Sequence, residues 1–114
     1  MRKGIDPVRA KSMLLATSPQ RLKLGRNKTA ERTPSGVEFR MYDATIFKLI
    51  EGAKRTVVLD LAGFWTPAVT KAMREYGEAC GFDIKPSLAK GRFTAKYNGV
   101  IHEADYNNQI IFEV

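Results

Sequence analysis

The basic residues are the ones in this sequence whose type and spacing suggest a function, and they are concentrated near its start. Residues 1–34 contain nine Lys or Arg and two acidic residues, whereas residues 35–114 contain ten of each sign. The formal net charge of +7 therefore belongs to the first third of the chain. A charge imbalance confined to one segment predicts an anionic partner, either nucleic acid or an acidic protein surface.

The spacing of these cations favours contact with phosphates, because Lys and Arg neutralise a nucleic-acid backbone and release its counterions. Between residues 21 and 28 a cation recurs every two or three residues, beside a predicted strand. A solvated tail that only aids solubility is the alternative. The predicted contact residues of this segment are Arg9, Lys11, Arg21, Lys23, Arg26, Lys28 and Arg32. Charge alone does not separate DNA, RNA and acidic protein as the partner.

A second basic stretch, residues 90–97, has some likeness to an RNA-binding strand with exposed aromatic rings. Strand alternation places Arg92 and Lys96 on one face and the aromatic residues on the other. We expect the aromatic face to point into the core, which leaves Arg92 and Lys96 as a basic outer stripe. Base stacking on Phe93 and Tyr97 is the alternative.

Two adjacent aromatic residues precede the best predicted helix. A staple role, in which an aromatic residue packs on the first helical turn, is favoured for Phe64. For Trp65 two interpretations stay open: such a structural contact, or an exposed anchor for a partner, since Trp is enriched at interface centres.

No arrangement of residues predicts catalysis. The chain has one His and one Cys, and no glycine-rich phosphate-binding pattern. His102 lies near Glu103 and Asp105, but a single His on a strand is more often structural, and Cys80 lies on the apolar face of a predicted helix. We therefore expect no enzyme activity, no catalytic residue, no metal site and no cofactor. No apolar run approaches the ~20 residues that span a bilayer, so no membrane partner is expected.

A short basic helix is predicted at the start of the chain. Asp6 can accept hydrogen bonds from free N–H groups of the first turn, and Pro7 suits the first helical position. The helix is expected to run to about Ala16. Its predicted apolar side consists of Val8, Met13, Leu14 and Leu15.

Alternating and β-rich runs predict strands on both sides of one central helix. The stretch 25–36 is polar and ends in a Pro-Ser-Gly turn, so it is predicted as a connection. The predicted strands are 21–24, 37–41, 45–50, 55–61, 82–88, 93–97, 100–103 and 109–114.

The central helix is predicted over about residues 66–80. Thr66 suits the N-cap, Pro67 the first helical position and Gly81 the left-handed position after the helix. Its apolar face consists of Val69, Ala72, Met73, Tyr76 and Cys80. The sequence predicts one small α+β domain over 20–114, in which a mainly antiparallel sheet packs on this helix, and a basic N-terminal helix or arm over 1–19.

Three runs, 24–29, 37–46 and 56–66, carry a resemblance to a known group of proteins. Over residues 22–114 their order resembles small, mostly uncharacterised proteins encoded by tailed bacteriophages. That group has a strand pair, a Gly-Trp-x-Thr turn, a helix rich in Thr, Lys, Arg and Met, and a closing hairpin. Here Phe64 stands where the group has Trp, with Trp65 one residue later.

The resemblance implies a phage origin and an accessory role in the cytoplasm of an infected bacterial host, and it transfers no catalytic residue. With the basic segment, it leads to the hypothesis of a non-enzymatic accessory protein that binds nucleic acid or a host nucleic-acid-processing complex. Two alternatives stay open. One is an inhibitor of a host defence protein, of the anti-CRISPR kind, that acts by protein–protein contact. The other is a virion component.

Overall fold

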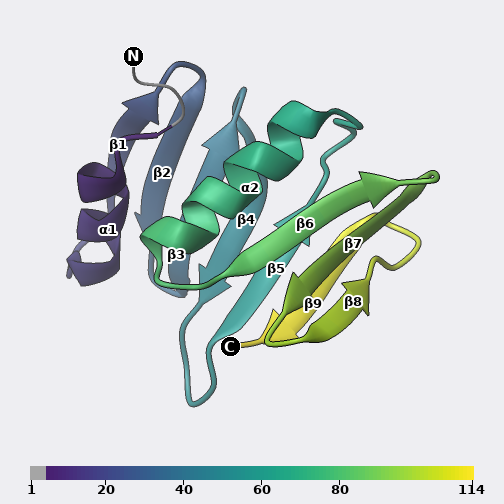
Figure 1. Cartoon of the computed structure of the whole chain (residues 1–114). Coiled ribbons are helices and arrows are strands. Elements are labelled where there is room, and N and C mark those ends of the chain that lie inside the picture. Colours follow the sequence, from purple (N-terminus) through teal and green to yellow (C-terminus); the bar gives the residue numbers. More distant parts are fainter. Residues whose placement is uncertain (1–4) are drawn as a thin grey trace.

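The fold is α+β, as predicted, and is seen in a computed structural model that describes residues 5–114 (Figure 1). This part of the chain forms two helices and nine strands, and every strand pair is antiparallel. In chain order the elements are α1 (Pro7–Leu15), β1 (Gln20–Gly25), β2 (Lys28–Thr33), β3 (Gly36–Met41), β4 (Ala44–Ile50), β5 (Thr56–Asp60), α2 (Pro67–Ala79), β6 (Ile84–Ala89), β7 (Arg92–Tyr97), β8 (Val100–Glu103) and β9 (Gln109–Glu113).

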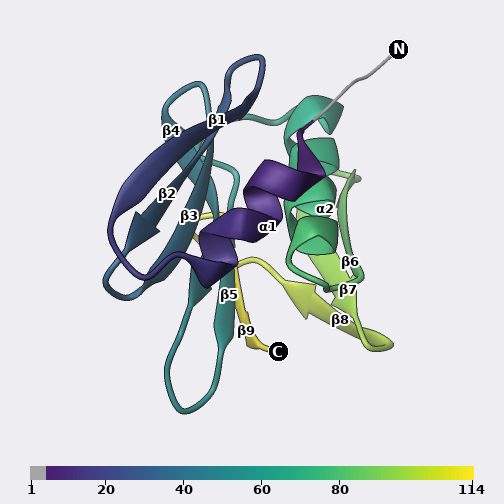
Figure 2. The ribbon, with the colours of Figure 1, turned by 90° about the vertical axis from the view of Figure 1, so that its left-hand side faces the viewer.

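The strands form two sheets of unequal size. Sheet A has six strands in the order β1-β2-β3-β4-β5-β9, and sheet B has three in the order β6-β7-β8. Both helices lie on the same side of sheet A (Figure 2). Within residues 5–114 no helix or strand covers its opposite side, which we call the open face. The open face is the surface of the large sheet that a partner can reach.

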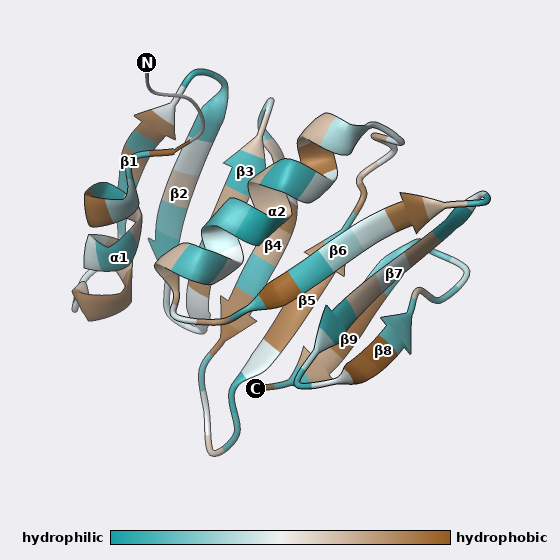
Figure 3. Ribbon diagram, in the orientation of Figure 1, coloured by the Kyte–Doolittle hydropathy of each residue, from teal (hydrophilic) through white to brown (hydrophobic). Residues whose placement is uncertain are grey.

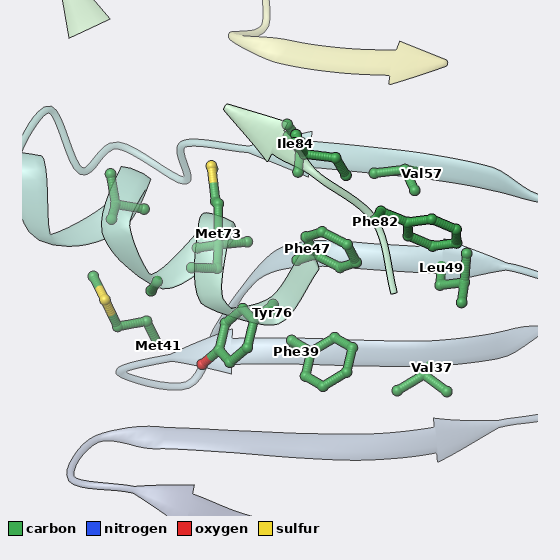
Figure 4. Packing of buried hydrophobic residues seen from close by; sticks show 14 of the residues in the cluster. Val37, Phe39, Met41, Phe47, Leu49, Val57, Met73, Tyr76, Phe82 and Ile84 are labelled. Atoms are coloured by element: carbon green, nitrogen blue, oxygen red, sulfur yellow. The ribbon is translucent and has the colours of Figure 1, made fainter. Parts of the chain in front are cut away.

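Alternation along the strands places the apolar core between sheet A and the helices (Figure 3). Phe39 on β3 stacks on Tyr76 of α2 with ring centroids 4.7 Å apart, and it meets Phe47 of β4 edge-on at 5.6 Å. All three side chains are fully buried (Figure 4). The core thus fixes α2 across the middle of the sheet.

Helix α2 matches the predicted central helix closely. Its face formed by Val69, Ala72, Met73 and Tyr76 is buried, and Gly81 has a φ of 90° just beyond the C-terminus. Thr66 is the N-cap, but its side chain donates and accepts no capping hydrogen bond.

Helix α1 begins where the sequence predicts but buries a different side. The Asp6 carboxylate accepts from the N–H groups of Val8 and Arg9 at 3.0 and 3.3 Å. The predicted apolar side is wrong at Val8 and Leu15, which are 77% and 80% exposed. Ala10 and Met13, three residues apart and therefore on one helical face, enter the same hydrophobic cluster as the sheet residues.

The second strand of sheet A is the main difference from the prediction, which treated residues 25–36 as a connection. Residues 28–33 form β2, and Ala30 is the only residue of this strand that is buried. Its ladder is supported by polar contacts: the Glu31 carboxylate lies 3.1 Å from Arg21 on β1 and 2.8 Å from Arg40 on β3. A strand without apolar alternation gives no periodic signal, so the pattern did not reveal it.

Candidate nucleic-acid interface

Three of the predicted contact cations lie around the turn that joins β1 to β2. Lys23 is near the end of β1, Arg26 is in the turn, and Lys28 begins β2, where it pairs with Gly25. We call these three residues the turn cluster. Lys23 and Arg26 are exposed and Lys28 is half-buried. None of the three has an ion-pair partner in the described part of the chain.

The neighbouring turn, between β3 and β4, lies beside this cluster. It consists of Tyr42 and Asp43, with φ values of 52° and 66°. The Tyr42 N–H donates to the Asn27 carbonyl at 2.9 Å, which joins the two turns. The Tyr42 ring is 60% exposed and contacts Phe64 at a centroid distance of 6.0 Å.

A surface pocket of about 280 Å³ lies between the two turns, lined by Asn27, Thr29, Tyr42 and Asp43. Lys23 is directly opposite Thr29 in the β1–β2 ladder, so its side chain starts about 5 Å from the pocket wall. Lys28 pairs with Met41, the residue before Tyr42. Alternation along β2 places Lys28 on the helix side of sheet A with Ala30, whereas Lys23 and Thr29 lie on the open face, so Lys23 is the cation of that face beside the pocket.

The remaining arginines of the basic segment are engaged with carboxylates. Arg21 lies 3.1 Å from Glu31, and Arg32 lies 2.5 Å from Glu51. The Arg32 side chain is only 16% exposed. Arg32 is therefore placed to hold the sheet together, whereas the side chain of Arg21 remains 57% exposed beside its partner Glu31.

Four further cations of the basic segment lie in α1 or before it in the sequence. Arg9 lies 3.8 Å from Asp6 and donates to the Lys23 carbonyl at 3.2 Å. Lys11 is exposed on α1 and has no carboxylate partner among residues 5–114. Arg2 and Lys3 lie outside the described residues.

The other predicted contact residues belong to other surfaces. Trp65, 47% exposed, lines a pocket of about 240 Å³ together with Arg92, and Arg92 lies 3.5 Å from Glu103. Lys96 lies on the outer face of sheet B, directly opposite Lys85. The structure therefore does not bring Trp65, Arg92 and Lys96 together with the turn cluster in one pocket.

The aromatic residues of β7 point inward, as expected. Phe93 is 3% exposed, and Tyr97 packs on Phe112 at a centroid distance of 5.4 Å. The alternative of base stacking is therefore wrong for Phe93, which is buried, whereas Tyr97 is half-buried against the core.

His102 and Cys80, the two residues considered for catalysis, both contact the hydrophobic core. His102 stacks on Phe112 at 4.6 Å. Burial raises the pKa of the Cys80 thiol to about 12, which keeps it protonated at neutral pH. Residues 5–114 contain no group of three His, Cys, Asp or Glu side chains that could hold a metal ion. Neither helix of the described chain is long and apolar enough to cross a membrane.

The sequence analysis did not single out Tyr42 as a contact residue. The signal that could have found it is its position: a bulky aromatic residue in a two-residue connection between the strands predicted at 37–41 and 45–50. Such turns favour Asn and Gly, because both central residues have positive φ.

Comparisons with known proteins give no relative from which a function could be inferred. No protein-family model matches the chain, and no significant match is found among curated proteins or solved structures.

Proposed function

We propose that this protein binds nucleic acid through the turn cluster, as a non-enzymatic accessory protein. The observation that carries the proposal is the contrast within the basic segment. Arg21 and Arg32 have carboxylate partners, whereas the three cations of the turn cluster have none in residues 5–114 and lie at one end of sheet A, with Lys23 on the open face and Lys28 on the opposite face. Unpaired cations at one place are the arrangement that backbone phosphates require.

The biological setting of the proposal comes from the sequence resemblance to phage-encoded proteins. In an infected bacterial cell, the partner would be free nucleic acid or the nucleic acid held by a host complex. Phosphate contacts fix the position of a protein on a strand without reading its sequence, so this surface alone supports binding of low sequence preference.

The test is charge reversal at the turn cluster, measured by fluorescence anisotropy with labelled DNA and RNA. The wild-type protein should bind with an affinity that falls as salt rises. Three phosphate contacts give a log–log slope of about −2.7 on duplex and about −2.1 on a single strand. The variant Lys23→Glu/Arg26→Glu/Lys28→Glu should lose detectable binding.

The matched control reverses three exposed lysines elsewhere, Lys54→Glu/Lys71→Glu/Lys90→Glu, with the same change in net charge. This control should keep most of the affinity for nucleic acid, because the proposal attributes binding to short-range contacts with phosphates and not to the total charge of the protein. Equal losses in both variants, or wild-type binding that salt does not weaken, would contradict the proposal. A host protein retained after nuclease treatment would instead favour the protein-inhibitor alternative.

A further inference from the structure

We propose that the pocket between the two turns holds one unstacked base on the Tyr42 ring, so that the ligand is single-stranded nucleic acid. This inference rests on the proposed function, because the turn cluster must hold the phosphates that flank the base.

The backbone at Tyr42 has an unfavourable conformation. A φ of 52° is left-handed, and for a bulky residue it is an unusual conformation that costs about 1–2 kcal/mol. Asn or Gly would form the same turn without that cost. Tyrosine therefore makes this turn less stable than Asn or Gly would, which indicates that its side chain has a role other than forming the turn.

The Tyr42 ring is accessible to a partner. Phe64 contacts Tyr42, yet 60% of Tyr42 remains exposed, so packing uses only part of its surface. Base–aromatic stacking contributes about 1–3 kcal/mol per base and needs an accessible ring. Tyr42 is the exposed aromatic residue that the register places beside the turn cluster.

The pocket beside the ring has a polar lining. The side chains of Asn27, Thr29 and Asp43 have no hydrogen-bond partner within the described chain. An amide offers both a donor and an acceptor, and a carboxylate accepts from the exocyclic amines of bases. These groups can pair with the edge of a base whose face lies on Tyr42.

The geometry also separates single strands from duplexes. Bases within a duplex are stacked and paired, so neither their faces nor their pairing edges are free for this pocket. The rest of the open face near the turn cluster presents Thr29 and Arg40 and no aromatic ring. A duplex can therefore use the cations alone, whereas a single strand gains the ring as well.

The experiment compares a labelled single strand of about 20 nucleotides with the duplex it forms with its complement. Wild-type protein should bind the single strand more tightly. Tyr42→Asn should weaken single-strand binding by roughly 5- to 100-fold and leave duplex binding unchanged, whereas Tyr42→Phe should keep it. Thermal unfolding serves as the folding control, because Asn suits the left-handed backbone and should not lower the melting temperature.

Two results would overturn the inference: duplex bound as tightly as single strand by the wild type, or Tyr42→Asn bound like wild type. If the turn-cluster variant still loses all binding in those cases, the proposed function stands and only the base pocket fails. If the wild type binds neither probe at low salt, both fail together.

Discussion

Two titratable residues lie near the end of α2, the buried Tyr76 and the half-buried Cys80. The Tyr76 hydroxyl donates to the Arg40 carbonyl at 2.6 Å, which ties the helix to β3. Burial raises the pKa of Tyr76 above its usual range and raises that of Cys80 to about 12. Both groups are neutral in the folded protein at pH 7, so they add no pH dependence there.

Stability should therefore fall in alkaline solution. In the unfolded chain the thiol loses its proton near pH 9 and the phenol near pH 10, whereas the folded protein holds both protons to higher pH. The folded state then binds more protons, so the free energy of unfolding decreases by about 1.4 kcal/mol per pH unit for each group.

Urea unfolding between pH 8 and 11 tests this expectation. Cys80→Ala should have a shallower decline than wild type from about pH 9 upward, because one of the two groups is gone. The comparison concerns the slope with pH, so a packing loss at pH 8 does not affect it. Identical slopes in both proteins would show that the thiol does not contribute.

For single residues, the sequence indicates which side chains could bind a partner, but not which of them are already engaged in ion pairs within the protein. The cations of residues 21–32 look alike in the sequence. The ladder separates them, because it sets Glu31 opposite Arg21, while Glu51 reaches Arg32 from beyond β4. Ion pairs across strands depend on the register of those strands. Residues 25–36 were predicted as a connection, and a connection has no register from which such pairs could be predicted.

Gly36, just after the β2–β3 turn, lies where the backbones of β3 and β4 approach closely. A Cβ on Gly36 would lie 1.9 Å from the Leu49 carbonyl oxygen on β4. No real contact is that short, and a backbone atom cannot rotate away as the end of a side chain can. Gly36 therefore allows β3 and β4 to pair at this end of sheet A.

Replacing Gly36 by Ala should destabilise the protein by about 3 kcal/mol or more, since the strands must separate locally. Gly99→Ala is the comparison: its φ of 78° is left-handed, and no atom lies within 4 Å of the added Cβ. We expect a loss of about 1 kcal/mol there. Urea titrations of both variants give the two values, and equal losses would refute the close-approach argument.

Elements with strong local signals were predicted well, and elements held by long-range contacts were not. The strands predicted at 93–97 and 100–103 are joined by Asn98-Gly99, a dipeptide typical of tight hairpins, with φ values of 51° and 78°, and Pro86 lies on the edge strand β6, where a proline is tolerated. Strand β2 lacks such signals, because its neighbours on both sides and not its own residues specify it. The pocket beside Tyr42 depends on that same strand, so the sequence could not place it.

At the scale of the whole molecule, α1 is part of the folded body. The Asp6 N–H donates to the Leu24 carbonyl at 2.7 Å, and Met13 is fully buried in the common cluster. The charge pattern set the first residues apart from the rest, whereas burial joins α1 to the sheet.

Met13→Ala should therefore lower the free energy of unfolding of the entire protein by about 2–5 kcal/mol. Leu15→Ala on the same helix, where the side chain is 80% exposed, should change it by about 0.5 kcal/mol or less. Circular dichroism during thermal unfolding should show one transition for each protein. A second, low-temperature transition, or an unchanged midpoint for Met13→Ala, would mean that α1 is not an integral part of the core.

The position of β9 in sheet A bears on the time course of folding. β9 pairs with β5, and the Gln109 amide donates to the Asp60 carboxylate at 2.9 Å although the two residues are forty-nine positions apart. α2 and all of sheet B lie between them in the chain. Hairpins such as β7–β8 close over a few residues, whereas the β5–β9 pairing must first confine this long intervening segment. We therefore expect the edge of sheet A at β9 to be completed late, after the local hairpins have formed.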